Sequence, residues 1–301
     1  MKKLFLTFLL AFAAVVVSNA QLLYRISHSS LGKPSYIVGT YHLAPATFVD
    51  SISGARAALD AVDVVCGEVV MSEMESMENL LKVQEAMMLP DGKSLSDIFT
   101  ADEMLRLNGY MEKLLGMNLE NPIIKSQMGN MTPMALSTQL QLVQYMKVTP
   151  GFNPMNLIDS YFQKAAVKAG KRVAGLESVE FQIATLYKGT PLERQKQQLL
   201  CMVDNDEYYT LQMKELSAAF FAQDMQALWN ITEEKMGNLC DSTPGEDESL
   251  IYGRNSVWVG KIPAMIAEAP TLFVVGAAHL PGEKGVLELL RAQGYTVEAV
   301  K

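Results

Sequence analysis

The same strand-and-turn pattern occurs near both ends of this 301-residue chain, and it constrains the fold more than any other feature. Residues 36–43 read Tyr-Ile-Val-Gly-Thr-Tyr-His-Leu, and residues 273–280 read Phe-Val-Val-Gly-Ala-Ala-His-Leu. Each is a β-type run that ends in Gly-x-x-His-Leu, with a proline within two residues of the leucine. Because Gly39 and Gly276 permit a sharp turn at the end of a buried strand, we predict two equivalent strand–turn–helix units that meet in one sheet.

The segment between these two units has mainly helical patterns. Thr100 and Glu103 form a capping box, and the apolar spacing of residues 156–169 is typical of a helix. We therefore predict an α/β (α+β) fold, in which a mixed sheet carries both Gly-x-x-His units and a large helical insertion, at about 72–252, covers that sheet. Residues 21–301 are expected to form a single domain.

The first twenty residues have the layout of a secretory signal peptide. A basic start precedes the apolar residues 4–17, and Ser18-Asn19-Ala20 is a small-residue cleavage site. The alternative is an uncleaved N-terminal anchor, although the apolar run is shorter than the ~18 residues that a membrane span needs. No later segment reaches that length, so we expect a mature chain without a transmembrane segment, exported to the periplasm or the extracellular space.

Charge and motifs argue against several classes of function. The net charge is −8, and no basic stretch is present to follow a phosphate backbone, so we expect no nucleic-acid partner. His-Glu-x-x-His, Gly-x-Ser-x-Gly and Walker-type loops are absent from the sequence. A serine hydrolase or a nucleotide enzyme therefore has no local support.

The two repeated histidines, His42 and His279, are the strongest candidates for chemistry. Both follow strands whose carboxyl ends are the usual ligand-binding edge of an α/β sheet. Imidazole suits metal binding and proton transfer near neutral pH, whereas the plain alternative is that each ring caps a turn or fills a gap in the core. The matched contexts favour function.

Two carboxylates end predicted strands and can complete such a site. Glu68 follows the apolar run that starts at Asp63, and Glu177 follows the run at 172–176. Each can ligate a metal or act as a general base, or simply face water at the end of its strand. Two histidines with one or two glutamates suit Zn, Mn, Co or Fe, and the spacing does not identify the metal.

The three cysteines predict one disulfide. Cys66 lies in an apolar run and is expected to stay buried and reduced, whereas Cys201 and Cys240 lie in the polar helical part and form the better pair. Thirteen of the 19 methionines lie between Met71 and Met155. This segment is either a ligand-facing cover that grips apolar or peptide ligands, or a helical core with methionine as gap-filler.

The motifs together resemble those of the TraB/GumN family, which includes plasmid pheromone-shutdown proteins and the Tiki proteins of animals. The resemblance covers nearly all of the mature chain: the Gly39–His42 turn, Leu176-Glu177 followed by Gln182, Arg254-Asn255, and the segment from Val275 to Gly282 with Gly294 after it. Tiki proteins are regarded as metal-dependent proteases that use two Gly-x-x-His motifs and a glutamate. The resemblance thus implies His42, His279 and Glu68 as site residues, with Glu177 and Arg254 as neighbours and Arg254 stabilising an oxyanion.

These observations predict a metal-dependent hydrolase with a divalent ion (Zn, Mn or Co) as its cofactor, acting on a peptide bond. One strand-end glutamate would take the proton of an attacking water, and the sequence leaves open whether Glu68 or Glu177 does so. Two alternatives stay open. One is a non-catalytic protein that sequesters a peptide or a small molecule, and the other is a carrier of metal or haem. The sequence predicts no oligomeric state.

Overall fold

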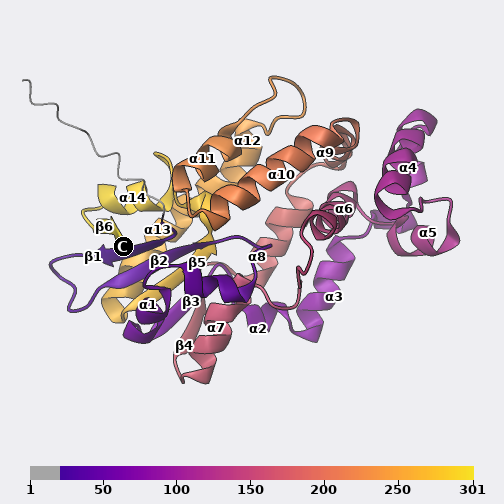
Figure 1. The fold of residues 1–301 in the computed structure, drawn as a ribbon. Helices are drawn as coiled ribbons and strands as arrows, with labels where there is room; N and C mark the ends of the chain where they lie inside the picture. The colour runs from indigo at the N-terminus through magenta and orange to yellow at the C-terminus, as the bar shows by residue number, and fades with distance from the viewer. Residues whose placement is uncertain (1–20) are drawn as a thin grey trace, which may run out of the picture.

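The computed structural model describes residues 21–301, so the predicted signal peptide, 1–20, lies outside the described residues. The fold is a mixed α/β arrangement with one six-stranded sheet, as predicted (Figure 1). Its strands, in spatial order, are β4 (Arg172–Gly175), β3 (Val64–Gly67), β5 (Thr271–Gly276), β2 (Ser35–Thr40), β1 (Leu23–Ser27) and β6 (Thr296–Ala299).

The strand order brings the two repeated units together. Strands β2 and β5 are parallel neighbours, and Gly39 pairs with Val275 while Thr40 pairs with Gly276. Strand β3 lies on the other side of β5, also parallel to it. The carboxyl ends of these three strands therefore lie at one edge of the sheet, and the residues that follow them share that edge. Strand β1 runs antiparallel to β2, so the first two strands form a hairpin.

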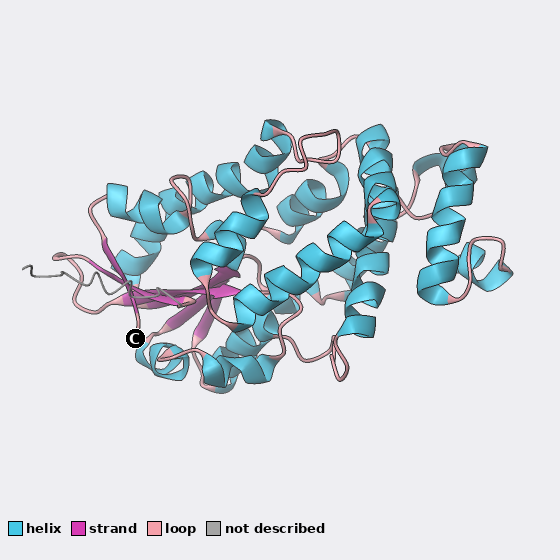
Figure 2. Cartoon of the chain, turned by 45° about the horizontal axis from the view of Figure 1, so that its top comes forward, coloured by secondary structure: helices cyan, strands magenta, loops and turns pink. Residues whose placement is uncertain are grey.

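Helices cover both faces of the sheet (Figure 2). The helices α1 (Ala55–Ala61) and α7 (Ile158–Lys168) lie on one face, whereas α13 (Gly253–Glu268) and α14 (Val286–Ala292) lie on the other (Figure 1). Their apolar sides form one core with the strands, in which Phe162, Trp258 and Phe273 are fully buried. This double cover accounts for the nearly continuous apolar sequences of β3 and β5, because both faces of these strands are buried.

The chain between β3 and β5 is largely helical, but it is not one uninterrupted insertion. Strand β4 and the preceding α7 return the chain to the sheet in the middle of this stretch (Figure 1). The description of residues 21–301 as a single domain stays a prediction. The α-helices of this stretch besides α7 and α13 are α2 (Met71–Met74), α3 (Met77–Ala86), α4 (Ala101–Leu115), α5 (Pro122–Met128), α6 (Pro133–Val148), α8 (Val179–Ile183), α9 (Leu192–Asp204), α10 (Asp206–Phe221), α11 (Met225–Glu233) and α12 (Pro244–Asp247).

Helices α4, α5, α6 and α9 form a second apolar cluster, and in Figure 1 α4 and α5 lie farthest from the sheet. Met111 is fully buried in this cluster, with Met104, Met128 and Met131 packed against it. These side chains are core-filling. None of the helices described for residues 21–301 is long and apolar enough to cross a membrane.

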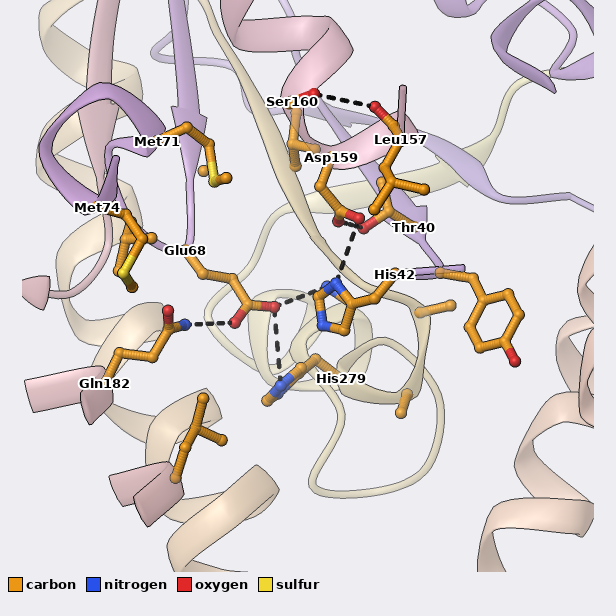
Figure 3. Close-up of a pocket in the computed structure, with 18 of the residues that line it drawn as sticks. Thr40, His42, Glu68, Met71, Met74, Leu157, Asp159, Ser160, Gln182 and His279 are labelled. Atoms are coloured by element: carbon orange, nitrogen blue, oxygen red, sulfur yellow. Dashed lines mark hydrogen bonds and ion pairs between the residues drawn. The ribbon is translucent and has the colours of Figure 1, made fainter. Parts of the chain in front are cut away.

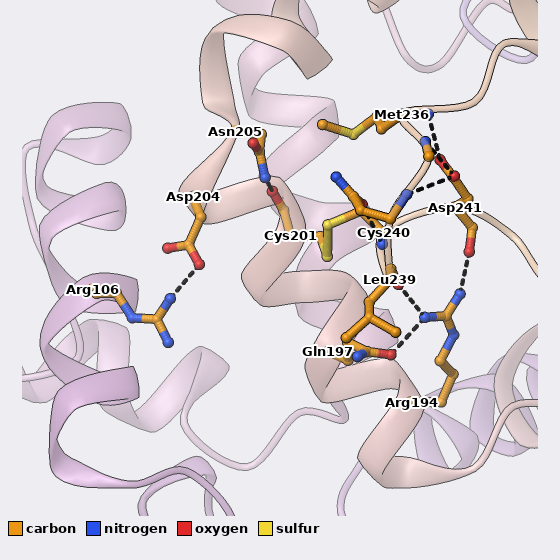
Figure 4. Close-up of a disulfide and its surroundings, with 12 residues drawn as sticks. Arg106, Arg194, Gln197, Cys201, Asp204, Asn205, Met236, Leu239, Cys240 and Asp241 are labelled. Carbon is orange, nitrogen blue, oxygen red and sulfur yellow. Dashed lines mark hydrogen bonds and ion pairs between the residues drawn. A yellow bond between two sulfur atoms is a disulfide. The ribbon is translucent and has the colours of Figure 1, made fainter.

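A disulfide joins Cys201 of α9 to Cys240 in the loop before α12, which is the pair that the sequence favoured (Figure 4). Cys66 is a buried free thiol in β3. Arg194 ties the same loop to α9 because its guanidinium donates to the carbonyl oxygens of Leu239 and Asp241. It also pairs with Glu246 of α12.

Candidate active site

The first Gly-x-x-His turn places His42 at the edge of the sheet with its side chain 74% exposed. Its Nδ1 lies 3.2 Å from Oδ2 of Asp159, in the first turn of α7. The Asp159 carboxylate also accepts a hydrogen bond from the Thr40 hydroxyl, so a residue of β2 fixes the group that orients the ring. The charge of Asp159 raises the pKa of His42. In turn, His42 and Thr40 lower the pKa of Asp159 although burial opposes this.

The second turn holds His279 in a different setting, with its side chain only 5% exposed. Its Nδ1 lies 2.7 Å from Oδ1 of Asn255, whose Nδ2 donates to the carbonyl oxygens of His279 and Lys284. Those two bonds fix the amide orientation, so His279 carries its proton on Nδ1 and keeps a lone pair on Nε2. The ring packs on Trp258 at 4.4 Å between centroids, and burial lowers the pKa of His279 to about 4.

Glu68 lies between the two histidine turns, one residue beyond β3 (Figure 3). Its Oε1 accepts a hydrogen bond from the backbone N–H of Gly276 at 2.8 Å and lies 4.0 Å from Nε2 of His279. Its Oε2 accepts from Arg254 at 2.6 Å and from Gln182 at 3.2 Å. Burial acts to raise the pKa of Glu68, but His279 and Arg254 outweigh it and the net direction is downward. The carboxylate is therefore ionised near neutral pH.

Arg254, in the first turn of α13, is the centre of a buried charge cluster. Its Nε and Nη2 donate to the two oxygens of Glu177, and Nη2 also donates to Glu68. Its Nη1 donates to the Leu250 carbonyl and lies 3.2 Å from Nε2 of His279. A guanidinium has five N–H groups, and all five are engaged here. Arg254 thus supplies positive charge to the site, but it has no spare N–H for an oxyanion in this arrangement.

Glu177 does not reach the site cavity. Its side chain is 3% exposed, and its oxygens accept from Arg254 and from the indole N–H of Trp258. Glu177 lies behind the arginine, and of the two predicted glutamates Glu68 is the one that lines the cavity.

The cavity at this edge of the sheet has a volume of about 730 Å³. The predicted site residues that line it are His42, Glu68, Arg254, Gly276 and His279. Gly39 has a packing role, because a Cβ there would lie 2.9 Å from the Leu280 side chain and 3.1 Å from Ala277. The two turns therefore approach more closely than any residue larger than glycine allows.

Sequence reasoning missed Asp159, Thr40, Trp258 and Gln163 as parts of the site. Gln163 braces the segment after Glu68, since its Nε2 donates to the Val69 carbonyl and its Oε1 accepts from the Met71 N–H. Thr40 lies inside the repeated motif, which is a signal that was available. Asp159 lies 117 residues from His42, and no local pattern connects the two.

The donor chemistry of this cavity fits a divalent metal. Two imidazoles and one carboxylate are a donor set of catalytic zinc sites, and ligating histidines usually donate their second ring N–H to a carboxylate or another acceptor. Asp159 and Asn255 occupy those second positions for His42 and His279. Within residues 21–301, however, no three His, Cys, Asp or Glu side chains converge closely enough to form a ready-made metal cluster. Arg254 is the group that holds Glu68 and His279 here.

These features define an α/β protein whose cavity, at the carboxyl edge of a mixed sheet, joins two Gly-x-x-His turns to a buried glutamate. The chain belongs to the TraB/PrgY/gumN family, whose sequence model matches residues 22–299. It is also similar to the protein named Metalloprotease TIKI1 of Danio rerio, with 22% identity over 302 residues and 88% of this chain covered. The match spans 60% of that relative's length. No solved structure matches the chain.

Proposed function

We propose that this protein is a metal-dependent hydrolase that acts on peptide bonds. The observation that carries the proposal is the meeting of His42, Glu68 and His279, from the ends of three neighbouring parallel strands, around one cavity. The similarity to a relative named as a metalloprotease supports the reaction class. The predicted metals, Zn, Mn or Co, stay part of this proposal.

Each polar side chain then has a definite task. His42, His279 and Glu68 would hold a divalent ion, and the ion would supply Lewis acidity to a carbonyl oxygen and make water more acidic. Glu68, ionised and facing the cavity, would take the proton of the attacking water through the carboxylate oxygen that does not bind the ion. Asp159 and Asn255 orient the two rings. Arg254 keeps Glu68 ionised and adds positive charge where negative charge develops on the substrate.

A second candidate is a protein that binds a peptide or a small molecule without cleaving it. Two observations favour it: the cavity is large enough for such a ligand, and every N–H of Arg254 is already engaged. In this case the charge cluster is structural, and the cavity holds its ligand through apolar contacts.

We also propose that the protein acts outside the cytoplasm. The disulfide between Cys201 and Cys240 supports this, because disulfides persist in oxidising compartments. Intact mass measurement of the exported protein is expected to give a chain that starts at Gln21. A mature chain that still carries Met1 contradicts the signal-peptide assignment.

The decisive experiment measures bound metal and peptide hydrolysis in the same preparations. Purified protein is loaded with Zn, Mn or Co, and metal content is measured for the wild type and for His42→Ala, His279→Ala and Asp159→Asn. Either histidine variant is expected to lose stoichiometric metal and hydrolysis together, and Asp159→Asn to weaken metal binding by about 10–100-fold. His28→Ala is the matched control, because His28 is exposed in the loop after β1 and its ring hydrogen-bonds to Ser30, away from the cavity.

The alternatives give different results. Metal uptake that depends on His42 and His279, without hydrolysis of any peptide, identifies a carrier. Peptide binding without metal and without cleavage identifies the sequestering protein. Equal metal content in all four variants refutes the proposed site.

A further inference from the structure

The cavity beside the two histidines has a distinct apolar wall. Its members, all contributed by helices, are Leu216 and Phe220 of α10, Leu228 of α11, and Leu250 and Ile251 of the helical turn Glu248–Tyr252. We call this set of residues the apolar wall. Thr232 of α11 is the one polar residue that α10, α11 and this helical turn contribute to the cavity lining, and none of the three contributes a charged residue to it.

The apolar wall packs against the first Gly-x-x-His turn at one end and contacts Arg254 at the other. Phe220 and Leu228 are buried, and the Phe220 ring lies 5.5 Å from that of Tyr41, the residue before His42. At the other end, the Leu250 carbonyl accepts a hydrogen bond from Arg254 at 2.9 Å. A group that rests on this wall therefore lies next to the histidines, Glu68 and Arg254.

Such a wall discriminates between side chains by desolvation. A Leu or Phe side chain that packs against the wall leaves water and is stabilised by the burial of its apolar surface. A Lys or Asp side chain in the same place loses hydration, and no residue of the apolar wall itself carries a charge that compensates this loss.

We propose that the apolar wall determines specificity and receives a bulky apolar side chain of a peptide, next to the bond that is cleaved. That a bond is cleaved rests on the proposed hydrolase function. The apolar wall adds the class of substrate, peptides with a bulky apolar side chain, which the polar residues of the site do not indicate.

The test uses end-blocked six-residue peptides that differ only at one central position, X, occupied by Leu, Phe, Lys or Asp in a background of Ala and Gly. Cleavage by the metal-loaded full chain gives kcat/KM, and fluorescence anisotropy of labelled peptides gives Kd for the metal-free chain. Peptides with Leu or Phe are expected to exceed those with Lys or Asp by about 10–100-fold in kcat/KM and to bind more tightly.

Variants decide whether the wall is responsible. Leu216→Glu is expected to lower kcat/KM for X = Leu at least about 10-fold and to improve cleavage of X = Lys, a change of preference that a merely structural defect does not produce. Thr232→Glu, at an exposed cavity-lining position one helical turn after Leu228, is expected to do the same and covers the case in which Leu216→Glu fails to fold. Leu211→Glu is the matched control, because Leu211 is an exposed leucine of the same helix that does not line the cavity.

Failure of this inference is distinguishable from failure of the proposed function. Cleavage at equal rates for all four peptides, or a Leu216→Glu variant that behaves like Leu211→Glu, overturns the specificity proposal and leaves the hydrolase standing. Preferential binding of X = Leu that Leu216→Glu abolishes, with no cleavage, supports the wall and overturns the hydrolase. Equal binding without cleavage overturns both.

Discussion

The two Gly-x-x-His turns share one sequence pattern and end adjacent parallel strands, yet their histidines have opposite surroundings. His42 is 74% exposed and has one carboxylate, Asp159, behind it. His279 is 5% exposed and is enclosed by Asn255, Arg254 and Trp258. The same turn thus leaves one ring open to the cavity and locks the other into the core.

The difference comes from the helices that pack behind each turn. Behind the first turn lies the start of α7, which contributes a single charged residue to the ring. Behind the second lies the start of α13, whose residues 254, 255 and 258 contribute a cation, an amide and an indole. The strand pattern therefore determines where a histidine is placed, and a remote helix determines its exposure and its pKa.

The largest effect is expected from removing the cation behind the second turn. Arg254→Met leaves Glu68 and Glu177 buried without a positive partner, so the free energy of unfolding is expected to fall by about 3–5 kcal/mol. Urea unfolding measures it. Arg56→Met is the control, because Arg56 pairs with Asp50 in the open and its loss is expected to cost less than about 1 kcal/mol. Similar small losses in both variants would mean that the charge cluster is not a stabilising part of the second turn.

The two histidines themselves give the most direct comparison. His279→Ala removes a ring that packs on Trp258 and leaves the Asn255 amide oxygen without its donor, so about 2–4 kcal/mol of stability is expected to be lost. His42→Ala removes an exposed ring and is expected to cost less than about 1 kcal/mol. Denaturant unfolding of both variants in the presence of a chelator checks this. If His42→Ala is the more destabilising change, the contrast between the turns is wrong.

The sequence was sufficient to predict how the backbone brings the two turns together. The strands around Gly39 and Gly276 carry continuous apolar runs with a turn glycine at the end, and this local pattern identifies buried parallel strands without knowledge of the rest. The mixed α/β class was predicted on the same basis and is confirmed. The membership of the family was recognisable because its motifs lie in these strands and turns.

The surroundings of the site were not predictable, because they depend on long-range packing. Asp159 begins a helix whose sequence gives no sign of a partner at His42, and only the path of α7 along the sheet brings them together.

Glu68 and Glu177 looked equivalent at the ends of two short strands. Arg254 separates them, since it and Trp258 occupy both oxygens of Glu177 and leave Glu68 at the cavity. Most methionines of the 71–155 segment lie away from the cavity, and only Met71, Met74 and Met155 line it.

The smallest effect is expected at a second arginine–glutamate pair. Its loss tests whether the contribution of such a pair to the free energy of unfolding depends on burial or on the two residue types alone. Arg194 and Glu246 form a two-bond pair like that of Arg254 and Glu177, but nearer to solvent. Arg194 lowers the pKa of Glu246 below its ordinary value of 4.5, against the effect of burial. Because the folded protein holds this carboxylate ionised more firmly than the unfolded chain does, the stabilisation is complete above pH 4.5 and is lost as the pH falls through the lowered pKa.

Glu246→Gln is therefore expected to lower the free energy of unfolding by about 1–2 kcal/mol at pH 7, well below the effect of Arg254→Met. The gap between this variant and the wild type is expected to narrow as the pH falls from 4.5 through the lowered pKa, because Glu246 then becomes protonated and neutral like the glutamine. Urea unfolding at a series of pH values measures this, with Glu248→Gln, at an exposed ion pair with Lys284, as the control. A gap that stays constant into acid would show that the charge of Glu246 does not provide the stabilisation, because both Arg194 and the Thr243 N–H favour the ionised carboxylate. A gap as large as that of Arg254→Met would show that the arginine–glutamate pairing, and not its burial, distinguishes the second turn from the first.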